Sequence, residues 1–336
     1  MVADNVVSYE AVLANGDVVV ADAQNNSDIF FALKGGGNQF AIVTEFRFQT
    51  FPISKVWGGH KVYAKDKKKA LLEAIQELTE NYYDPKAAII ATFSTTLDTL
   101  FDIFVIFYFY NSPEGPGEIF QKFNKIPALV DATKMGSLLD LVKANSVFSI
   151  VGSRYLSRTS TMPSLPGSNG TALYNHLFNS WYDGARRMQL ADINNYVFSL
   201  AFQPIPHQLA EASIKNPSGV NLLGLNPEHG DKLFLEYTVS WLHRHADKSA
   251  ADYITRLVDT GASNARKMFA GIKPTNYKSG DLEEASYRPL FMNDAMHNQD
   301  VFGSYGPVNH AKLVEIQRRR DPDGFFSKRT GGFKVV

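Results

Sequence analysis

The chain lacks several features that would mark other classes of protein. It has no cysteine among its 336 residues, which excludes a disulfide framework, thiolate catalysis and cysteine-ligated metal. Its 34 basic and 34 acidic residues cancel, so no charge excess draws it to nucleic acid or to an anionic membrane surface. The apolar run FDIFVIFYFY, residues 101–110, is about half as long as a membrane-spanning helix requires. Composition therefore predicts a globular protein without nucleic-acid or membrane partners.

Patterns typical of several enzyme classes are also missing. Neither a nucleophile elbow nor a GxxxxGK[ST] phosphate loop occurs, so nothing supports a hydrolase or a kinase. Among the eight histidines, only His243 and His245 approach the spacing of metal ligands. Nothing resembling a third ligand accompanies them, whereas catalytic zinc normally takes three protein ligands. The sequence therefore predicts no metal site and places both histidines at the surface, just past a strand.

The pattern of apolar residues predicts an α+β fold in two lobes. Phe51-Pro52 ends the first lobe, because proline cannot continue a sheet ladder, and the 44% hydrophobic content is enough for a sizeable core. Apolar residues at helical spacing, Leu71, Leu72, Ile75 and Leu78, predict a helix over 66–81. The strands expected after Pro52 are 55–63, 88–94, 101–110, 196–203 and 233–241. The further helices expected are 117–124, 137–144, 172–188, 247–262 and 309–320, and the polar segment 157–169 reads as a surface loop or lid.

The first 48 residues combine several recognisable elements. Two β-rich runs meet at Asn15-Gly16, a dipeptide that favours a tight type I′ hairpin turn. A short helix over 28–33 is followed by Gly35-Gly36-Gly37-Asn38, which allows close approach of the backbone to a ligand. The strand 42–48 closes the segment.

Near the other end, residues 285–326 read ASYRPLFMNDAMHNQDVFGSYGPVNHAKLVEIQRRRDPDGFF. The stretch contains an Asn-bearing strand, a Tyr-Gly pair and a helix that Asp321-Pro322 stops. Together, the two end segments resemble the berberine-bridge-like FAD-linked oxidoreductases, the fungal branch of the vanillyl-alcohol oxidase superfamily with PCMH-type FAD-binding domains.

The resemblance implies three regions. Residues 1–52 would be the C-terminal part of a FAD-binding domain, and residues 53–284 a substrate-binding domain of antiparallel sheet covered by helices. Residues 285–336 would form a segment that packs back on the FAD lobe. Family members carry an earlier half-domain with a glycine-rich pyrophosphate loop and, in many, a histidine that bonds covalently to the flavin. No residue of this sequence matches either, so the resemblance predicts non-covalent FAD binding, if the chain binds FAD at all, with an affinity below that of a complete relative.

The resemblance also assigns cofactor-binding residues. These lie in the two end segments and are Asn5, Val6, Gly36, Gly37, Asn38, Ile42 and Asn293. On pattern alone, the glycine triplet fits a plain turn, and Asn293 equally fits a turn-capping residue whose amide bonds the backbone.

The segment LFLEYTVSW, residues 233–241, carries the catalytic candidate. By the two-residue period of a strand, Phe234, Glu236, Thr238 and Ser240 point to one face. Family members have a Glu or Gln on the corresponding strand, five positions before a Trp, and Glu236 has this offset from Trp241. The resemblance implies that Glu236 accepts a substrate proton, which a partly buried carboxylate can do. The alternative is a solvent-facing Glu on an amphipathic strand.

The resemblance further implies substrate contacts at Phe291, Thr238 and Phe234. Phe291 and Asp294 stand where relatives often carry tyrosines that bind or deprotonate substrate. This replacement disfavours a mechanism based on a tyrosine at either position.

Three functional hypotheses follow. The first is a FAD-linked oxidoreductase of secondary metabolism that transfers hydride from a small organic substrate to flavin, with oxygen as the final acceptor. The second is a cofactor-free cyclase or isomerase that acts by positioning its substrate. The third is a fragment that needs a complementing polypeptide or oligomer to cover its strand edges. No basic-then-apolar leader is visible, so the default expectation is a cytoplasmic protein, and a secreted one if the natural chain starts upstream.

Overall fold

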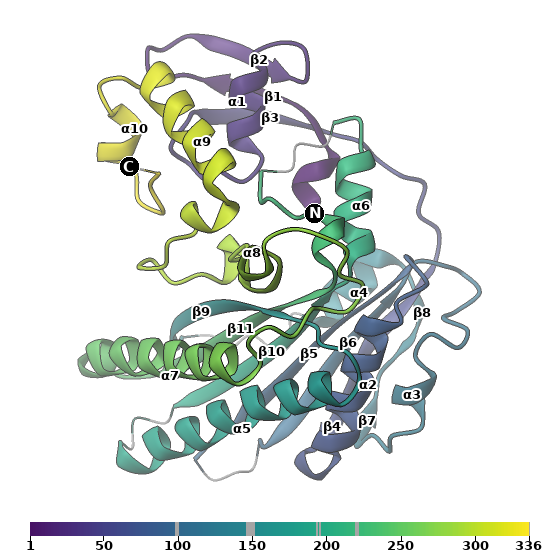
Figure 1. Cartoon of the computed structure of the whole chain (residues 1–336). Helices are drawn as coiled ribbons and strands as arrows, with labels where there is room; N and C mark the ends of the chain where they lie inside the picture. The colour runs from purple at the N-terminus through teal and green to yellow at the C-terminus, as the bar shows by residue number, and fades with distance from the viewer. Residues whose placement is uncertain (98–100, 146–151, 193, 195, 219–221, 336) are drawn as a thin grey trace. The chain divides into compact units, whose positions relative to one another are not determined.

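The computed structural model describes residues 1–97, 101–145, 152–192, 194, 196–218 and 222–335. They form two compact units, of which the first comprises Met1–Pro52, His207–His229 and Lys278–Val336, and the second Ile53–Pro206 and Gly230–Tyr277 (Figure 1). Residues 207–229 thus belong to the first unit, although the sequence-based boundaries place them in the substrate-binding domain. The functional roles assigned to the domains stay predictions. Within the described residues, no helix has the length and apolar character needed to cross a membrane.

The first unit contains a three-stranded sheet of order β2-β1-β3, with both pairs antiparallel. Its strands and longer helices are β1 (Val6–Val12), β2 (Val18–Asp22), α1 (Ser27–Leu33), β3 (Ile42–Phe48), α6 (His207–Lys215), α8 (Leu282–Tyr287), α9 (Pro307–Arg320) and α10 (Phe325–Arg329). Its 3-10 turns are η1 (Val2–Asn5), η4 (Pro227–His229), η6 (Met292–Asp294) and η7 (Gly303–Tyr305).

The hairpin expected at Asn15-Gly16 is confirmed, but its turn type is not. A type I′ turn needs positive φ at both central residues, and only Gly16 has it, at 88°. The side chain of Asn15 bonds Asp17 instead, with 2.7 Å between its Nδ2 and the carboxylate, and its Oδ1 accepts the Asp17 N–H at 3.1 Å. These local bonds favour a longer connection between β1 and β2.

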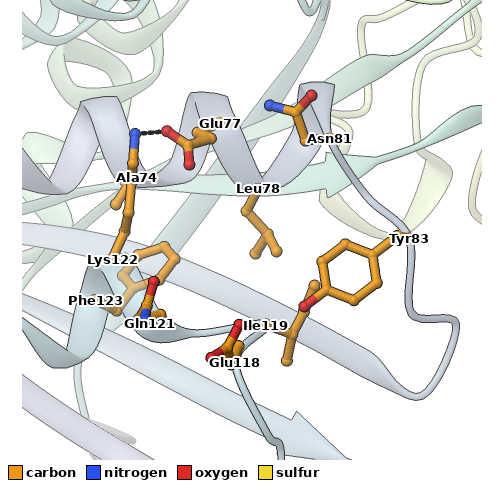
Figure 2. Close-up of a pocket in the computed structure, with 10 residues that line it drawn as sticks. All are labelled: Ala74, Glu77, Leu78, Asn81, Tyr83, Glu118, Ile119, Gln121, Lys122 and Phe123. Carbon is orange, nitrogen blue, oxygen red and sulfur yellow. Dashed lines mark ion pairs between the residues drawn. The ribbon is translucent and has the colours of Figure 1, made fainter.

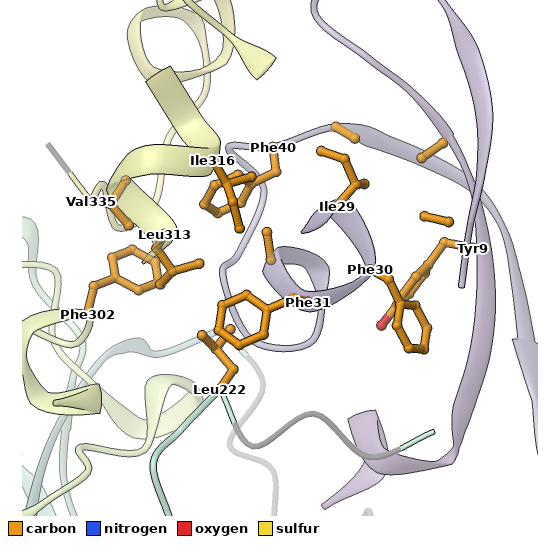
Figure 3. Close-up of a cluster of buried hydrophobic side chains, with 14 of the residues drawn as sticks. Tyr9, Ile29, Phe30, Phe31, Phe40, Leu222, Phe302, Leu313, Ile316 and Val335 are labelled. Atoms are coloured by element: carbon orange, nitrogen blue, oxygen red, sulfur yellow. The ribbon is translucent and has the colours of Figure 1, made fainter. Parts of the chain in front are cut away.

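A large hydrophobic cluster lies in the core of the first unit (Figure 3). Ile29 and Phe30 of α1 lie in it with Tyr9 of β1, while Leu313 and Ile316 come from α9. These residues are far apart in the sequence, yet each is nearly inaccessible to solvent. The apolar face of α1 is therefore buried between the sheet and α9, so residues from both ends of the chain form this core.

The second unit is an eight-stranded sheet of order β7-β4-β6-β5-β10-β11-β9, with β8 also paired to β4, and every pair is antiparallel. Its strands are β4 (Val56–Ala64), β5 (Ala87–Thr95), β6 (Ile103–Tyr110), β7 (Val130–Asp131), β8 (Lys134–Gly136), β9 (Arg154–Pro163), β10 (Val197–Ile205) and β11 (Lys232–Trp241). Its helices are α2 (Lys68–Glu80), α3 (Gln121–Asn124), α4 (Leu138–Asn145), α5 (Gly167–Ala191) and α7 (Asp247–Met268), with the turns η2 (Lys65–Lys67) and η5 (Arg244–Ala246).

Helices α2, α5 and α7 lie along one face of this sheet (Figure 1). Phe93 of β5 packs against Phe178 and Trp181 of α5, with ring centroids 4.9 and 5.6 Å apart. Because neighbouring residues of a strand point to opposite faces, Thr92 and Ser94 point away from these helices. The predicted α+β class, an antiparallel sheet covered by helices, is confirmed.

The loop or lid expected over 157–169 is wrong. Residues up to Pro163 belong to β9, which pairs with β11 over ten residues, and α5 begins at Gly167. The polar residues that suggested a loop find partners within the sheet and beyond it: Thr159 Oγ1 donates to the Leu235 carbonyl at 2.9 Å, and Arg158 forms a bidentate pair with Asp259 of α7. With these partners, Ser and Thr suit a strand, as β-branched Thr generally does.

The strand expected to carry Asn293 is also wrong. Residues 292–294 form the 3-10 turn η6, in which the Asp294 N–H bonds the Phe291 carbonyl at 3.1 Å and the Ala295 N–H bonds the Met292 carbonyl at 3.2 Å. These backbone groups are satisfied locally, so they do not pair with a neighbouring strand.

Candidate active site

A hollow of about 520 Å³ lies on the sheet face of the second unit that is opposite α5. Strands β5, β6, β10, β11 and β9 supply its walls. Its lining residues are Thr92, Ser94, Val105, Phe107, Ser153, Tyr155, Val197, Ser199, Ala201, Glu236, Thr238 and Ser240. The predicted face of β11 is confirmed for Glu236, Thr238 and Ser240, which all line this hollow. A volume of this size suits a small organic molecule.

Glu236 is the one charged residue among those lining the hollow. Its Oε1 accepts a hydrogen bond from the Tyr155 hydroxyl of β9 at 3.0 Å. Burial raises the pKa of Glu236 above its ordinary value of 4.5, and the bond from Tyr155 opposes that rise. A carboxylate with a raised pKa, held in place and open to a cavity, has the properties of a general base.

Side-chain hydroxyls surround this carboxylate. Ser94 lies opposite Ser199 in the β5–β10 register, and their Oγ atoms are 2.8 Å apart. Ser199 in turn lies opposite Thr238 on β11. Thr92 and Ser240 extend this polar surface in both directions. The hollow can therefore donate and accept several hydrogen bonds while offering a single negative charge.

Of the three predicted substrate residues, one lines the hollow and two lie elsewhere. Thr238 lines the hollow beside Glu236. Phe234 lies on the same strand but is only 1% exposed and is not among the lining residues. Phe291 is half-buried in the first unit, immediately before η6. The structure thus brings Glu236 and Thr238 together in one cavity, whereas Phe234 packs in the core.

The glycine cluster has a packing role of its own. The Gly36 N–H donates to the Ala32 carbonyl at 2.8 Å, and a Cβ at Gly36 would lie 2.2 Å from that oxygen and 2.6 Å from the Phe40 ring. The Gly35 carbonyl accepts the Tyr305 hydroxyl at 3.2 Å. Gly36 is therefore required to fold this loop tightly against α1, and its N–H is already bonded within the protein.

The predicted FAD-binding residues fit the cofactor in part. Val6 is 3% exposed and belongs to the core. Gly36 is also buried, because it packs within the loop that follows α1. The other members are exposed or half-buried: Gly37, Asn38 and Asn293 are exposed, Ile42 is 56% exposed and Asn5 is half-buried. These five leave amide, backbone and apolar surface accessible, which is the chemistry that the adenosine and ring edges of FAD require. Their roles stay predictions.

Another hollow, of about 230 Å³, lies between α2 and residues 118–123 (Figure 2). Glu77 and Lys122 form an ion pair across it, and Leu78 and Phe123 supply apolar surface. None of the predicted site residues lines it.

The two spaced histidines do not form a metal site in the part of the chain that the structure describes. The rings of His243 and His245 stack with centroids 5.5 Å apart, and both residues are exposed directly after β11. No group of three or more possible ligands occurs among the described residues.

Sequence reasoning missed the tyrosine and most of the hydroxyls of the hollow. Tyr155 lies two residues before the segment that the sequence predicts to be a loop, so its place on a strand beside Glu236 could not be predicted. For Thr92, Ser94 and Ser199, a signal existed: they alternate with Phe93, Phe198 and Leu200, which is the pattern of a strand with one polar face. Only the register of the sheet, however, shows that these alternations meet at Glu236.

Comparison with known proteins gives relatives along the whole chain, although no family model matches it. An uncharacterized FAD-linked oxidoreductase of Arthroderma benhamiae is 33% identical over 334 residues, which is 99% of this chain and 63% of that protein. The bifunctional solanapyrone synthase of Alternaria solani is 28% identical over 342 residues, 99% of this chain and 59% of that protein. The chain thus spans about three fifths of the length of these curated relatives.

Solved structures share the fold. The 6-hydroxy-D-nicotine oxidase of Arthrobacter nicotinovorans matches with a TM-score of 0.69 at 14% identity, over 99% of this chain and 66% of that one. A berberine bridge enzyme variant in complex with (S)-reticuline matches with a TM-score of 0.63 at 17% identity, over 99% of this chain and 65% of that one. The chain is thus similar in sequence to FAD-linked oxidoreductases, and it shares its fold with the nicotine oxidase and the berberine bridge enzyme.

Proposed function

We propose that this chain supplies the substrate-binding portion, and part of the flavin-binding portion, of an oxidase that acts on a small alcohol, amine or polyketide-like compound in secondary metabolism. The observation that carries the proposal is Glu236, the single carboxylate in a hydroxyl-lined hollow of about 520 Å³. FAD, when bound, supplies the hydride acceptor, and oxygen is the final electron acceptor. The residues proposed to hold it are Asn5, Gly37, Asn38, Ile42 and Asn293.

In this proposal, Glu236 takes the proton that leaves the substrate O–H or N–H when the adjacent carbon is oxidised. Its pKa is raised by burial, which makes its carboxylate a better proton acceptor than an exposed one. Ser199 and Thr238 hydrogen-bond the substrate and hold the reacting group within reach of Glu236. Because no lining residue carries a positive charge, the hollow favours neutral or protonated-amine substrates over anionic ones.

The test compares Glu236→Gln with Glu114→Gln, a matched change at an exposed glutamate of the second unit. Hydrogen peroxide release is measured with FAD and a panel of benzylic alcohols, oligosaccharides and cyclic amines, and the most active compound is used throughout. The expected result is a loss of about 100-fold or more in kcat for Glu236→Gln, with FAD affinity unchanged and Glu114→Gln fully active. Unchanged turnover in Glu236→Gln would contradict the proposal, and FAD-independent conversion would favour the cyclase or isomerase hypothesis.

A further inference from the structure

We propose that Tyr155 is a positioning residue of the active site, whose hydroxyl fixes the Glu236 carboxylate through Oε1 and leaves Oε2 to meet the substrate. This inference rests on the proposed function, because it assigns a purpose to the geometry around the proposed base. Tyr155 comes from β9, a different strand from Glu236, and lies on the wall of the same hollow.

The register of the sheet shows that this contact is not a simple cross-strand pair. Tyr155 lies opposite Ser240, and Glu236 lies opposite Thr159, four residues further along β9. The two side chains therefore extend toward each other along the strands, past the pair formed by Thr238 and Ser157. An extended phenol can cover that distance, and the resulting hydrogen bond is 3.0 Å long.

The bond gives Glu236 one defined partner. Among the described residues, the Tyr155 hydroxyl is the hydrogen-bond donor to Glu236, and it reaches Oε1 alone. A carboxylate bonded through one oxygen loses rotational freedom about its last torsion angle, and its second oxygen is left to accept from a molecule in the cavity. When Oε2 receives the substrate proton, Oε1 becomes the carbonyl oxygen of the acid and can still accept from the phenol. The pair therefore keeps its geometry through the transfer.

Among the described residues that line the hollow, only Glu236 and Tyr155 have ionisable side chains. The residues that β5, β6 and β10 contribute to the hollow are all uncharged. The arginines of β9 are paired with carboxylates of α7, Arg154 with Asp247 and Arg158 with Asp259. His60 contacts Phe107 from β4, four strands from β11 in the sheet order. The protonation of Glu236 thus depends on its burial and on Tyr155, as the two causes of its pKa shift indicate.

Tyr155 also stands between two hollows. It lines both the hollow with Glu236 and a neighbouring one of about 530 Å³, which includes Arg154 and Trp241. The residue is 57% exposed, so replacing its hydroxyl by hydrogen leaves the core intact. Tyr155→Phe is therefore a clean test, since the variant keeps the ring and loses only the donor.

The first measurement needs neither substrate nor cofactor. Infrared difference spectra between low and high pH follow the carbonyl stretch of protonated carboxyl groups in the whole chain, and the band missing from Glu236→Gln belongs to Glu236. In Tyr155→Phe, that band should titrate at a higher pH, because the carboxylate loses its donor. The band should also move to a higher frequency, because the carbonyl of the protonated acid loses the same hydrogen bond. Tyr83→Phe, which removes a hydroxyl from a 67% exposed tyrosine, should leave the band unchanged. An unchanged Glu236 band in Tyr155→Phe overturns the proposal.

The second measurement is the pH profile of peroxide release. Tyr155→Phe should lower kcat about tenfold, with KM within about twofold, and should shift the acidic limb of the profile upward. A loss of kcat without that shift would identify a merely structural role and overturn the inference. Full activity of Glu236→Gln would instead refute the proposed function, even if the infrared shift shows that the hydrogen bond exists. Failure of the proposed function can therefore be distinguished from failure of the inference about Tyr155.

Discussion

At the scale of single residues, the buried carboxylate of Glu236 is expected to lower the free energy of unfolding at neutral pH. Burial raises its pKa in the folded chain, so the folded state holds the proton more tightly than the unfolded state. The favourable contribution is then present below the unfolded pKa and is lost as the pH rises through the folded pKa. A base kept in such a position is expected to lower the stability of the protein at neutral pH.

Glu236→Gln should therefore melt at a higher temperature than the unaltered chain at pH 8, by about 2 °C, and show little difference at pH 4. The amide keeps an oxygen that accepts from Tyr155 and carries no charge to desolvate. Thermal melts followed by circular dichroism at both pH values check this. The same change at both would show that the charge of Glu236 is not the cause.

The glycine cluster gives a second prediction at this scale. Gly36→Ala should lower the free energy of unfolding by about 3 kcal/mol or more, because its Cβ would lie 2.2 Å from the Ala32 carbonyl oxygen. At Gly37, the nearest atom to an added Cβ would be Phe302 Cζ at 4.0 Å, an ordinary van der Waals contact, so Gly37→Ala meets only the strain of a φ of 71° and its expected cost is about 1 kcal/mol. Urea unfolding of both variants measures the difference, and equal costs would refute the packing explanation.

At the scale of elements, an ion pair joins α1 to α9. Asp28, in the first turn of α1, accepts from Arg320 at 2.8 and 2.9 Å and from Arg319 at 2.8 Å. The two bonds from Arg320, together with the bond from Arg319, hold the pKa of Asp28 well below its ordinary value. The carboxylate also faces the positive end of the α1 dipole. The two helices are thus tied by charge as well as by the apolar cluster of the first unit.

Asp28→Asn should reduce the free energy of unfolding at pH 7 by about 1–2 kcal/mol. A depressed pKa contributes stability above the unfolded pKa and loses it as the pH falls through the folded pKa. The difference between variant and unaltered chain should therefore shrink in strongly acidic solution. Denaturant melts across pH measure it, and a difference that does not depend on pH would rule out the ion pair as its source.

Elements with a strong local pattern could be predicted, and those defined by distant partners could not. The helix α2 follows from Leu71, Leu72, Ile75 and Leu78, which are all buried as expected. By contrast, β9 owes its structure to the ten-residue pairing with β11 and to Asp259 of α7, neither of which its own residues reveal. The turn η6 was missed for a different reason: its backbone bonds close over three residues, and the spacing of apolar residues does not reveal such a turn.

At the scale of the whole molecule, the similarity to FAD-linked oxidoreductases and the α+β class could be predicted from the two end segments and the order of elements. The candidate site was accessible only in part. Glu236 and Thr238 followed from the two-residue period of one strand together with a family resemblance. Tyr155, Ser94 and Ser199 join them only through the register of three other strands, which a single sequence does not specify.

The chain covers 63% of the A. benhamiae relative and 66% of the nicotine oxidase chain. Because these proteins are longer, the oxidase activity proposed above also involves regions that this chain does not contain. The most direct measurement is a titration of the purified 336-residue chain with FAD, followed by quenching of flavin fluorescence. We expect saturable binding of one FAD per chain, weakened by Asn38→Ala and unaffected by Glu114→Gln. A folded, monomeric chain that leaves the flavin fluorescence unchanged at every concentration would contradict flavin chemistry for this polypeptide.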